Sequence, residues 1–195
     1  MDPNIKFALG IIAGVIAFCT YVIYIASILK GETKPNLASW WIWTFMSFVL
    51  VLSYYFSGAR NTIWVPTVEF LGPLSIALLS IKRGEGGYTD KTDLFCLVGV
   101  VVSVILWVVF NSPVIALISN LVIDAFAFVP TIKKSYLRPR GENLLAWSTT
   151  GLAEAVNLFA MERFTFNIAI YPVYMLVADI VLILLLIRGR VSKSE

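Results

Sequence analysis

Seven long apolar stretches alternate with short polar breaks along the 195 residues of this chain. A helix needs roughly 20 apolar residues to cross about 30 Å of hydrocarbon, and each stretch is about that long. Membrane-spanning strands would instead be about 10 residues of alternating polarity. We therefore predict an all-α membrane protein with seven transmembrane helices. The expected spans are Ile5–Leu29, Leu37–Phe56, Thr62–Ile81, Thr92–Phe110, Pro113–Ile132, Leu144–Met161 and Phe166–Ile187.

Composition agrees with this pattern. The chain is 59% hydrophobic and only 14% charged, with a mean hydropathy of +0.85, whereas soluble domains are about a quarter charged. One small core could not bury so much apolar surface, so lipid must be the solvent for most of the chain. The first stretch is longer than the ~7–15 residues of a signal-peptide core and has no clear cleavage site. We expect it to be retained as the first helix.

The basic residues of the polar breaks lie mainly on one side of the predicted membrane. If successive breaks alternate between sides, the opposite side holds only Lys6, Arg60 and Arg163. Short loops rich in Lys and Arg stay in the cytoplasm. We therefore predict a multi-pass plasma-membrane protein with its N-terminus outside and its C-terminus in the cytoplasm. The twelve residues expected in the cytoplasm, of fifteen in all, are Lys30, Lys34, Lys82, Arg83, Lys91, Lys133, Lys134, Arg138, Arg140, Arg188, Arg190 and Lys193.

An internal repeat is visible at an offset of 107 residues. The segment Asn36–Trp40 (Asn-Leu-Ala-Ser-Trp) opens the second apolar stretch, and Asn143–Trp147 (Asn-Leu-Leu-Ala-Trp) opens the sixth. Pro66 and Pro172 match at nearly the same offset. Both segments follow a short basic loop, and this agreement argues against chance similarity among Leu-, Ala- and Trp-rich helices.

The repeat pairs the first three helices with the last three and leaves the fourth unmatched. A three-helix unit ends on the opposite side of the membrane, so one extra crossing is needed to keep the two copies parallel. This predicts a first repeat in residues 1–84, a linker helix in 85–111, and a second repeat with a short cytoplasmic tail in 112–195. Parallel repeats of this kind place the substrate between them, near the midplane.

The second repeat also has a recognisable motif. Pro130–Lys134 (Pro-Thr-Ile-Lys-Lys) is followed by Glu142–Leu144 (Glu-Asn-Leu). With its plan of three, one and three helices, the chain resembles the PQ-loop/SWEET-like (MtN3/saliva-type) transporter superfamily, although Thr131 replaces the glutamine and Ile23 stands where the first repeat would have its proline. The resemblance implies two bundles that rock between outward- and inward-open states. Pro130 would then be a bend near the cytoplasmic gate; an ordinary membrane-helix proline is an equal alternative.

Four carboxylates lie near the middle of predicted spans: Glu69, Asp124, Glu154 and Asp179. A central acidic residue costs up to about 2.5–3.5 kcal/mol to insert, so none should face lipid. No Lys or Arg lies at comparable depth to pair with them. We expect all four side chains to line the bundle interior or a wet cavity.

Helical spacing groups these acids with other polar residues. Asn120 and Asp124 are four apart and lie on one helix face, as do Glu154 and Asn157, which are three apart. Trp43 lies on the corresponding stripe of the second helix. We predict that these faces converge on one polar, aromatic-lined cavity. The alternative for each polar side chain is a hydrogen bond between helices, worth about 0.6 kcal/mol.

These residues favour a small-solute carrier, either a uniporter or proton-coupled, that works by alternating access. Asn120, Asn157 and Trp43 would contact a small polar solute, and a protonatable acid would orient or couple it. Trp147, near the cytoplasmic interface, is either a gate or a packing residue. A ligand-binding receptor or sorting protein on the same bundle is the alternative function.

Several functions and partners are excluded. The chain has no His, so His-based zinc motifs and Ser-His triads are absent, and we predict no enzyme activity, cofactor or metal. The basic residues lie between apolar stretches, where they indicate the orientation of the helices in the membrane. We therefore expect no nucleic-acid partner. The lipid bilayer, a solute with or without H⁺, and a homo-oligomer remain as partners. We interpret Cys19 and Cys96 as small buried hydrophobic residues.

Overall fold

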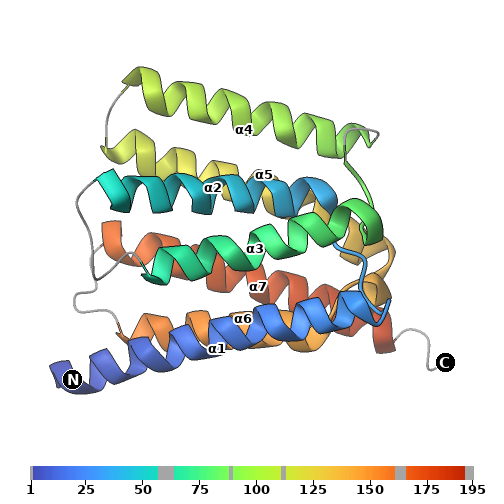
Figure 1. Ribbon diagram of the computed structural model, residues 1–195, viewed down its shortest axis with the longest axis horizontal. Coiled ribbons are helices and arrows are strands. Elements are labelled where there is room, and N and C mark those ends of the chain that lie inside the picture. Colours follow the sequence, from blue (N-terminus) through green and yellow to red (C-terminus); the bar gives the residue numbers. More distant parts are fainter. Residues whose placement is uncertain (1, 57–63, 88–89, 111–112, 161–165, 192–195) are drawn as a thin grey trace. The chain divides into compact units, whose positions relative to one another are not determined.

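The computed structural model describes residues 2–56, 64–87, 90–110, 113–160 and 166–191. In these ranges the chain forms seven α-helices, one short 3-10 helix and no strand (Figure 1). The predicted all-α class and the seven helices are thereby confirmed. The helices are α1 (Pro3–Leu29), α2 (Leu37–Phe56), α3 (Trp64–Arg83), α4 (Lys91–Phe110), α5 (Pro113–Leu137), η1 (Pro139–Gly141), α6 (Leu144–Ala160) and α7 (Phe166–Val191).

Hydropathy and length single out α1. Over the described residues, only its segment Asn4–Leu29 is both long and apolar enough to cross a membrane. The core helix of a soluble protein, or a signal sequence near the N-terminus, would meet the same criteria. Membrane crossing by all seven helices therefore stays a prediction.

Equivalent asparagines begin α2 and α6. Asn36 Oδ1 accepts the backbone N–H of Ser39 at 3.0 Å, and Asn143 Oδ1 accepts the N–H of Ala146 at 2.9 Å. Each asparagine thus satisfies an N–H of the first turn, which has no partner within its own helix. The asparagine of each copy of the repeated Asn-Leu-x-x-Trp motif is therefore the N-cap of its helix.

The helices form two compact units. Unit 1 consists of residues 1–33 and 138–195, and unit 2 of residues 34–137. In unit 1, α6 packs against both α1 and α7, and η1 packs against α7. In unit 2, α2 packs against α3, α4 and α5, while α4 also packs against α5.

The two units exchange the first helices of the predicted repeats. Each unit combines the first helix of one repeat with the second and third helices of the other: α1 with α6 and α7, and α5 with α2 and α3. The α1–α6 contact is therefore the counterpart of the α5–α2 contact. The compact units differ from the predicted domains 1–84, 85–111 and 112–195. Those domains describe the sequence repeat and stay a prediction.

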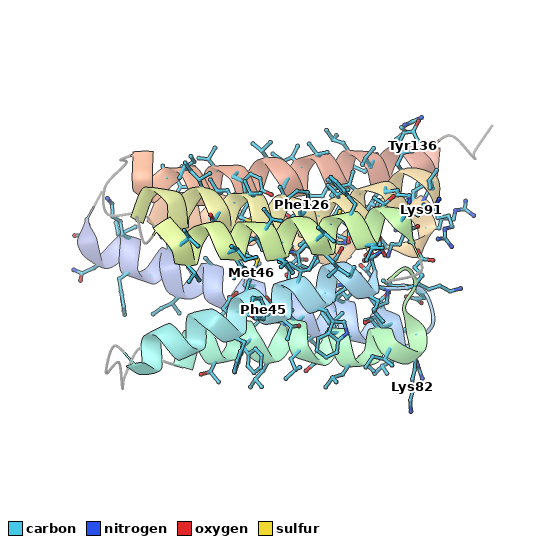
Figure 2. All side chains as sticks on the ribbon, turned by 90° about the horizontal axis from the view of Figure 1, so that it is seen from above. Phe45, Met46, Lys82, Lys91, Phe126 and Tyr136 are labelled. Carbon is cyan, nitrogen blue, oxygen red and sulfur yellow. The ribbon has the colours of Figure 1, made fainter. Side chains whose placement is uncertain are left out.

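The core of unit 2 lies between α2, α4 and α5. Gly99 on α4 permits this packing, because a Cβ there would lie 2.5 Å from the Phe126 ring. Figure 2 shows Met46 of α2 and Phe126 of α5 midway along their helices. Buried Ile42, Val100, Ile123 and Ala127 form the core, with Trp43, Met46, Leu97, Val104 and Phe126 packed against them.

In the described helices, several acidic side chains are buried and many large apolar side chains are exposed. Asp93, Asp124, Asp179 and Glu142 are each at most 2% exposed, whereas large apolar side chains cover the surface. Cys96 is buried as expected, but Cys19 is exposed, because it lies on an outward apolar face of α1. Exposed apolar residues follow α1 at Ile5, Phe7, Ile11, Ile12, Val15, Phe18, Val22 and Leu29, and α4 at Leu94, Phe95, Val98, Val101, Val102, Ile105, Val108 and Val109.

Candidate functional site

The structure joins two of the predicted site residues in unit 2. Trp43 on α2 donates its indole N–H to Asp124 Oδ1 on α5, with a distance of 3.0 Å between the two atoms. Asp124 lies in the middle of its helix and is 2% exposed. A buried carboxylate must be hydrogen-bonded or coordinated, and the indole supplies one such bond. The predicted stripes of the second and fifth helices therefore face each other at this pair.

Aromatic packing holds the indole in place. Trp43 makes edge-on contacts with Trp40 and with Phe128, and both pairs of ring centroids are 5.1 Å apart. Such T-shaped pairs stabilise a defined ring orientation beyond the burial of area. The indole N–H is thereby directed at Asp124 by its neighbours.

A second polar link between α2 and α5 lies close to Pro130. Ser39 Oγ donates to the Ala127 carbonyl at 2.5 Å, and Thr131 Oγ1 donates to Ser39 Oγ at 2.9 Å. Both hydroxyl residues are fully buried. Pro130 is buried too and lies inside α5, which continues to Leu137. Thr131, predicted to occupy the glutamine position of the motif that the chain resembles, thus forms a link between helices. The predicted bend at Pro130 stays a prediction.

In unit 1, the predicted gate residue Trp147 belongs to a buried hydrogen-bonded cluster. Its indole N–H donates to Glu142 Oε2 at 2.9 Å, and the Tyr24 hydroxyl donates to the same oxygen at 2.6 Å. The Tyr24 and Trp147 rings meet edge-on with centroids 6.2 Å apart. These contacts favour the packing interpretation of Trp147. Glu142 is 1% exposed and is the shared acceptor of the cluster.

Sequence reasoning missed Tyr24 and Glu142 as interacting residues. The signal was present in the repeat, because Tyr24 and Thr131 are also 107 positions apart. Both residues reach from a first helix to the start of the second helix of the other repeat. The contacts could not be predicted without knowing that each first helix packs against the second helix of the other repeat.

The remaining acids of unit 1 are placed differently from one another. Asp179 on α7 is fully buried, and Gly151 on α6 lies beside it, since a Cβ there would be 3.6 Å from the Asp179 Cβ. Glu154 is half-buried, but Asn157 is exposed. The predicted Glu154–Asn157 stripe therefore does not lie on one buried face, because Asn157 is exposed where Glu154 is half-buried.

The convergence of all these faces on one cavity stays a prediction. Glu69 on α3 is half-buried in unit 2, the unit that also contains Trp43 and Asp124. Glu154, Asn157 and Asp179 belong to unit 1. The side chain of Asn120 lies outside the described residues.

Another buried acid, Asp93, joins two loops at one end of unit 2. Asp93 Oδ2 accepts the Asn36 amide at 3.1 Å and the Gly87 N–H at 2.5 Å. Gly86 has a φ of +80°, and a Cβ there would lie 2.3 Å from Asp93 Oδ2, so only glycine fits. The glycine-rich loop is thus shaped around a carboxylate that also orients the N-cap of α2.

A surface ion pair lies at the same end. Lys133 Nζ is 2.9 Å from Asp90 Oδ1 and 2.6 Å from the Thr92 hydroxyl. The hydrogen bond from Lys133 lowers the pKa of Asp90 below its ordinary value, and the Thr92 N–H adds to this effect. Nearby, the buried Lys134 donates from Nζ to the Lys34 carbonyl.

Basic residues gather at one end within each unit. Figure 2 shows Lys82, Lys91 and Tyr136, from α3, α4 and α5, at the same end of unit 2. The contacts of Lys133 and Lys134 place these two residues there as well. In unit 1, Arg140 and Arg190 line one cavity together with Glu32.

No protein-family model, curated protein or solved structure matches the chain. The resemblance to the PQ-loop/SWEET-like superfamily therefore stays a prediction. Among the residues that the structure describes, no group of three or more His, Cys, Asp or Glu side chains could hold a metal ion.

Proposed function

We propose that this protein is a seven-span membrane carrier for a small polar solute and that the Trp43–Asp124 pair forms part of its binding site. The observation that supports this best is the pair itself. A carboxylate is buried halfway along an apolar helix, and an aromatic N–H donor from another helix meets it there. Intramembrane acids are costly and mark solute or proton pathways.

The burial of acids and the exposure of apolar side chains support membrane crossing by helices of both units. Apolar side chains are exposed along α1 and α4, while the acids of α4, α5 and α7 are buried. Large exposed apolar patches are rare on soluble monomers. In lipid the same surfaces are solvated, and each helix satisfies its backbone hydrogen bonds internally.

The gathering of basic residues supports the proposed orientation. Twelve of fifteen basic residues belong to breaks on one predicted side. Lys82 and Lys91 lie at one end of unit 2 (Figure 2), and Arg140 and Arg190 line one cavity in unit 1. The positive-inside rule assigns this side to the cytoplasm. The protein would then lie in the plasma membrane with its N-terminus outside.

In this proposal Asp124 binds a proton or a cationic group of the solute, and Trp43 provides a rigid apolar and hydrogen-bonding wall. Alternating access would expose the pair to one side of the membrane at a time, as the predicted parallel repeats imply. Polar solutes with a hydrogen-bond donor or positive charge suit a carboxylate acceptor.

The test is solute flux into proteoliposomes. Sugars and amino acids are first screened by thermal shift between pH 5 and 8, and the stabilising compounds are then offered as radiolabelled solutes under a pH gradient and without one. We expect Asp124→Asn to reduce uptake at least tenfold, because it removes the titratable group and its charge. Asp90→Asn, a matched change at the surface, should leave uptake unchanged.

Two outcomes would contradict the carrier proposal. Uptake that is the same for Asp124→Asn and wild type would remove the proposed site. Saturable binding without flux under either gradient would favour a receptor or sorting protein built on the same bundle.

A further inference from the structure

A cavity of about 350 Å³ opens at the basic end of unit 1. We call it the basic pocket. Arg140 of η1 and Arg190 of α7 line it and are exposed. We propose that the basic pocket binds a phosphomonoester, with the phosphate held between these two guanidinium groups. The other lining residues are Ser27, Glu32, Thr33, Glu142 and Asn143.

Both arginines are available to a ligand. Neither guanidinium group forms a hydrogen bond or ion pair with another residue that the structure describes, although Glu32 and Glu142 line the same cavity. Each guanidinium is a planar fork of N–H donors that matches two phosphate oxygens at once. Two such forks facing one cavity favour phosphate over a singly charged carboxylate.

The two arginines are brought together by a close contact between η1 and α7. Pro139 of η1 packs directly on Gly189 of α7, where an added Cβ would lie 1.8 Å from Pro139 Cγ. Arg140 and Arg190 are the next residues along the chain from this contact. The glycine therefore permits an approach that holds the two side chains at one cavity.

The acids and hydroxyl groups of the pocket narrow the class of ligand. Glu142 is buried and already accepts hydrogen bonds from Tyr24 and Trp147. Glu32 is exposed and can accept a donor from the ligand. Ser27 and Thr33, whose hydroxyl oxygens are 2.5 Å apart, are buried. Two carboxylates disfavour a ligand with more than one phosphate group, so the ligand has a single phosphate on a group that also has hydroxyl donors.

A soluble phosphate ester and a lipid headgroup share this chemistry, and binding measurements distinguish them. The purified full-length protein is titrated calorimetrically with inorganic phosphate and with glycerol 3-phosphate. In parallel, native mass spectrometry counts lipids retained from nanodiscs that contain phosphatidic acid or only phosphatidylcholine. Glycerol 3-phosphate should bind more tightly than inorganic phosphate, because its hydroxyl groups reach the acceptors of the pocket.

Variants of the pocket decide the proposal. Arg140→Gln and Arg190→Gln should each weaken binding at least tenfold. Gly189→Ala should weaken it as well without removing a charge, because the added Cβ moves η1 away from α7. Lys30→Gln removes an exposed charge of unit 1 that does not line the pocket, and it should bind like wild type. Thermal unfolding of each variant checks that it is folded.

The outcomes are distinct. Arginine-dependent binding of glycerol 3-phosphate identifies a soluble ligand, and the same dependence confined to phosphatidic acid identifies a lipid. If neither arginine variant weakens binding, or if Lys30→Gln weakens it equally, the basic pocket is not a phosphate site. The measurements involve no transport, so they are independent of the carrier proposal.

Discussion

The α1–α6 contact of unit 1 and the α5–α2 contact of unit 2 are counterparts in the repeat, yet their chemistry differs. Both begin at an asparagine N-cap followed by a buried tryptophan, Trp147 or Trp40. In unit 1 the link between helices is a buried carboxylate, Glu142, with two donors. In unit 2 it is a pair of neutral hydroxyl groups. The repeat thus preserves the cap and the contact but not the groups that meet there.

The middle of the same helices differs further. Asp124 and Trp43 form their pair in unit 2, whereas the positions 107 residues away hold Ala17 and Thr150. Thr150 donates to the Ala146 carbonyl of its own helix. Of these two positions related by the offset of 107, only the one in unit 2 therefore has a carboxylate paired with an indole. The proposed Trp43–Asp124 site therefore has no equivalent in unit 1.

The largest effect should come from Glu142→Ala. The change leaves the buried Tyr24 hydroxyl and Trp147 N–H without their acceptor, and each such group costs about 1–3 kcal/mol. We expect the free energy of unfolding to fall by about 3 kcal/mol in reversible detergent titrations. Glu32→Ala, in an exposed position nearby, should change it by less than about 0.5 kcal/mol. Equal effects of the two changes would show that Glu142 does not hold the contact.

The corresponding change in unit 2, Ser39→Ala, should cost less. It removes a neutral hydrogen bond to the Ala127 carbonyl and the acceptor of Thr131, so we expect a loss of about 1–2 kcal/mol. A double-mutant cycle with Thr131→Val should give a coupling of at least about 0.5 kcal/mol. Additive losses in the same detergent titrations would mean that the two hydroxyl groups act independently.

The two N-caps should behave alike. Asn36→Ala and Asn143→Ala each remove an acceptor of a first-turn N–H, which typically costs about 1 kcal/mol. Asn36 also donates to Asp93, so its replacement should cost somewhat more than that of Asn143. Asn→Asp variants keep the cap oxygen and should recover most of the loss at Asn143. A zero cost at Asn143 would contradict the equivalence of the caps.

The smallest effect concerns the surface acid of unit 2. The pKa of Asp90 is lowered in the folded state by Lys133, so the pair stabilises the protein above the unfolded pKa of aspartate. This stabilisation is lost as the pH falls through the lower folded value. Because the side chains are 40% and 38% exposed, we expect only a few tenths of a kcal/mol.

Unfolding measured between pH 7 and pH 3 checks this prediction. Asp90→Asn should remove the pair's contribution to the pH dependence, and high salt should reduce it in wild type. A wild-type profile that matches the variant over the whole range would show that the ion pair does not stabilise the fold.

The positions of the helices were predictable from sequence. The expected span Leu37–Phe56 coincides with α2, and the other spans match their helices to within a few residues over the described ranges. Hydropathy determines these limits, because about 20 apolar residues between polar breaks favour one long helix. Helical spacing also predicted that Trp43 and Asp124 lie on the polar stripes of their helices, and the structure brings these two side chains into contact.

The sequence could not assign partners to the helices. A repeat at an offset of 107 shows which segments are alike, but it does not show that α1 packs with α6, or α5 with α2. The Tyr24–Glu142–Trp147 cluster depends on that pairing, because its residues are far apart along the chain. The pattern likewise placed Asn157 beside Glu154 on an inward face, but the packing of α6 leaves it exposed.

Local interactions therefore account for the helices and their caps, because each depends on residues within a turn or a loop of one another. The choice of helix partners, the shared acceptor at Glu142 and the pocket between Arg140 and Arg190 arise only when distant segments meet. The energies of these contacts depend on close packing between segments that are distant in the sequence, such as Pro139 against Gly189. The hydrophobic pattern along the chain does not predict that packing.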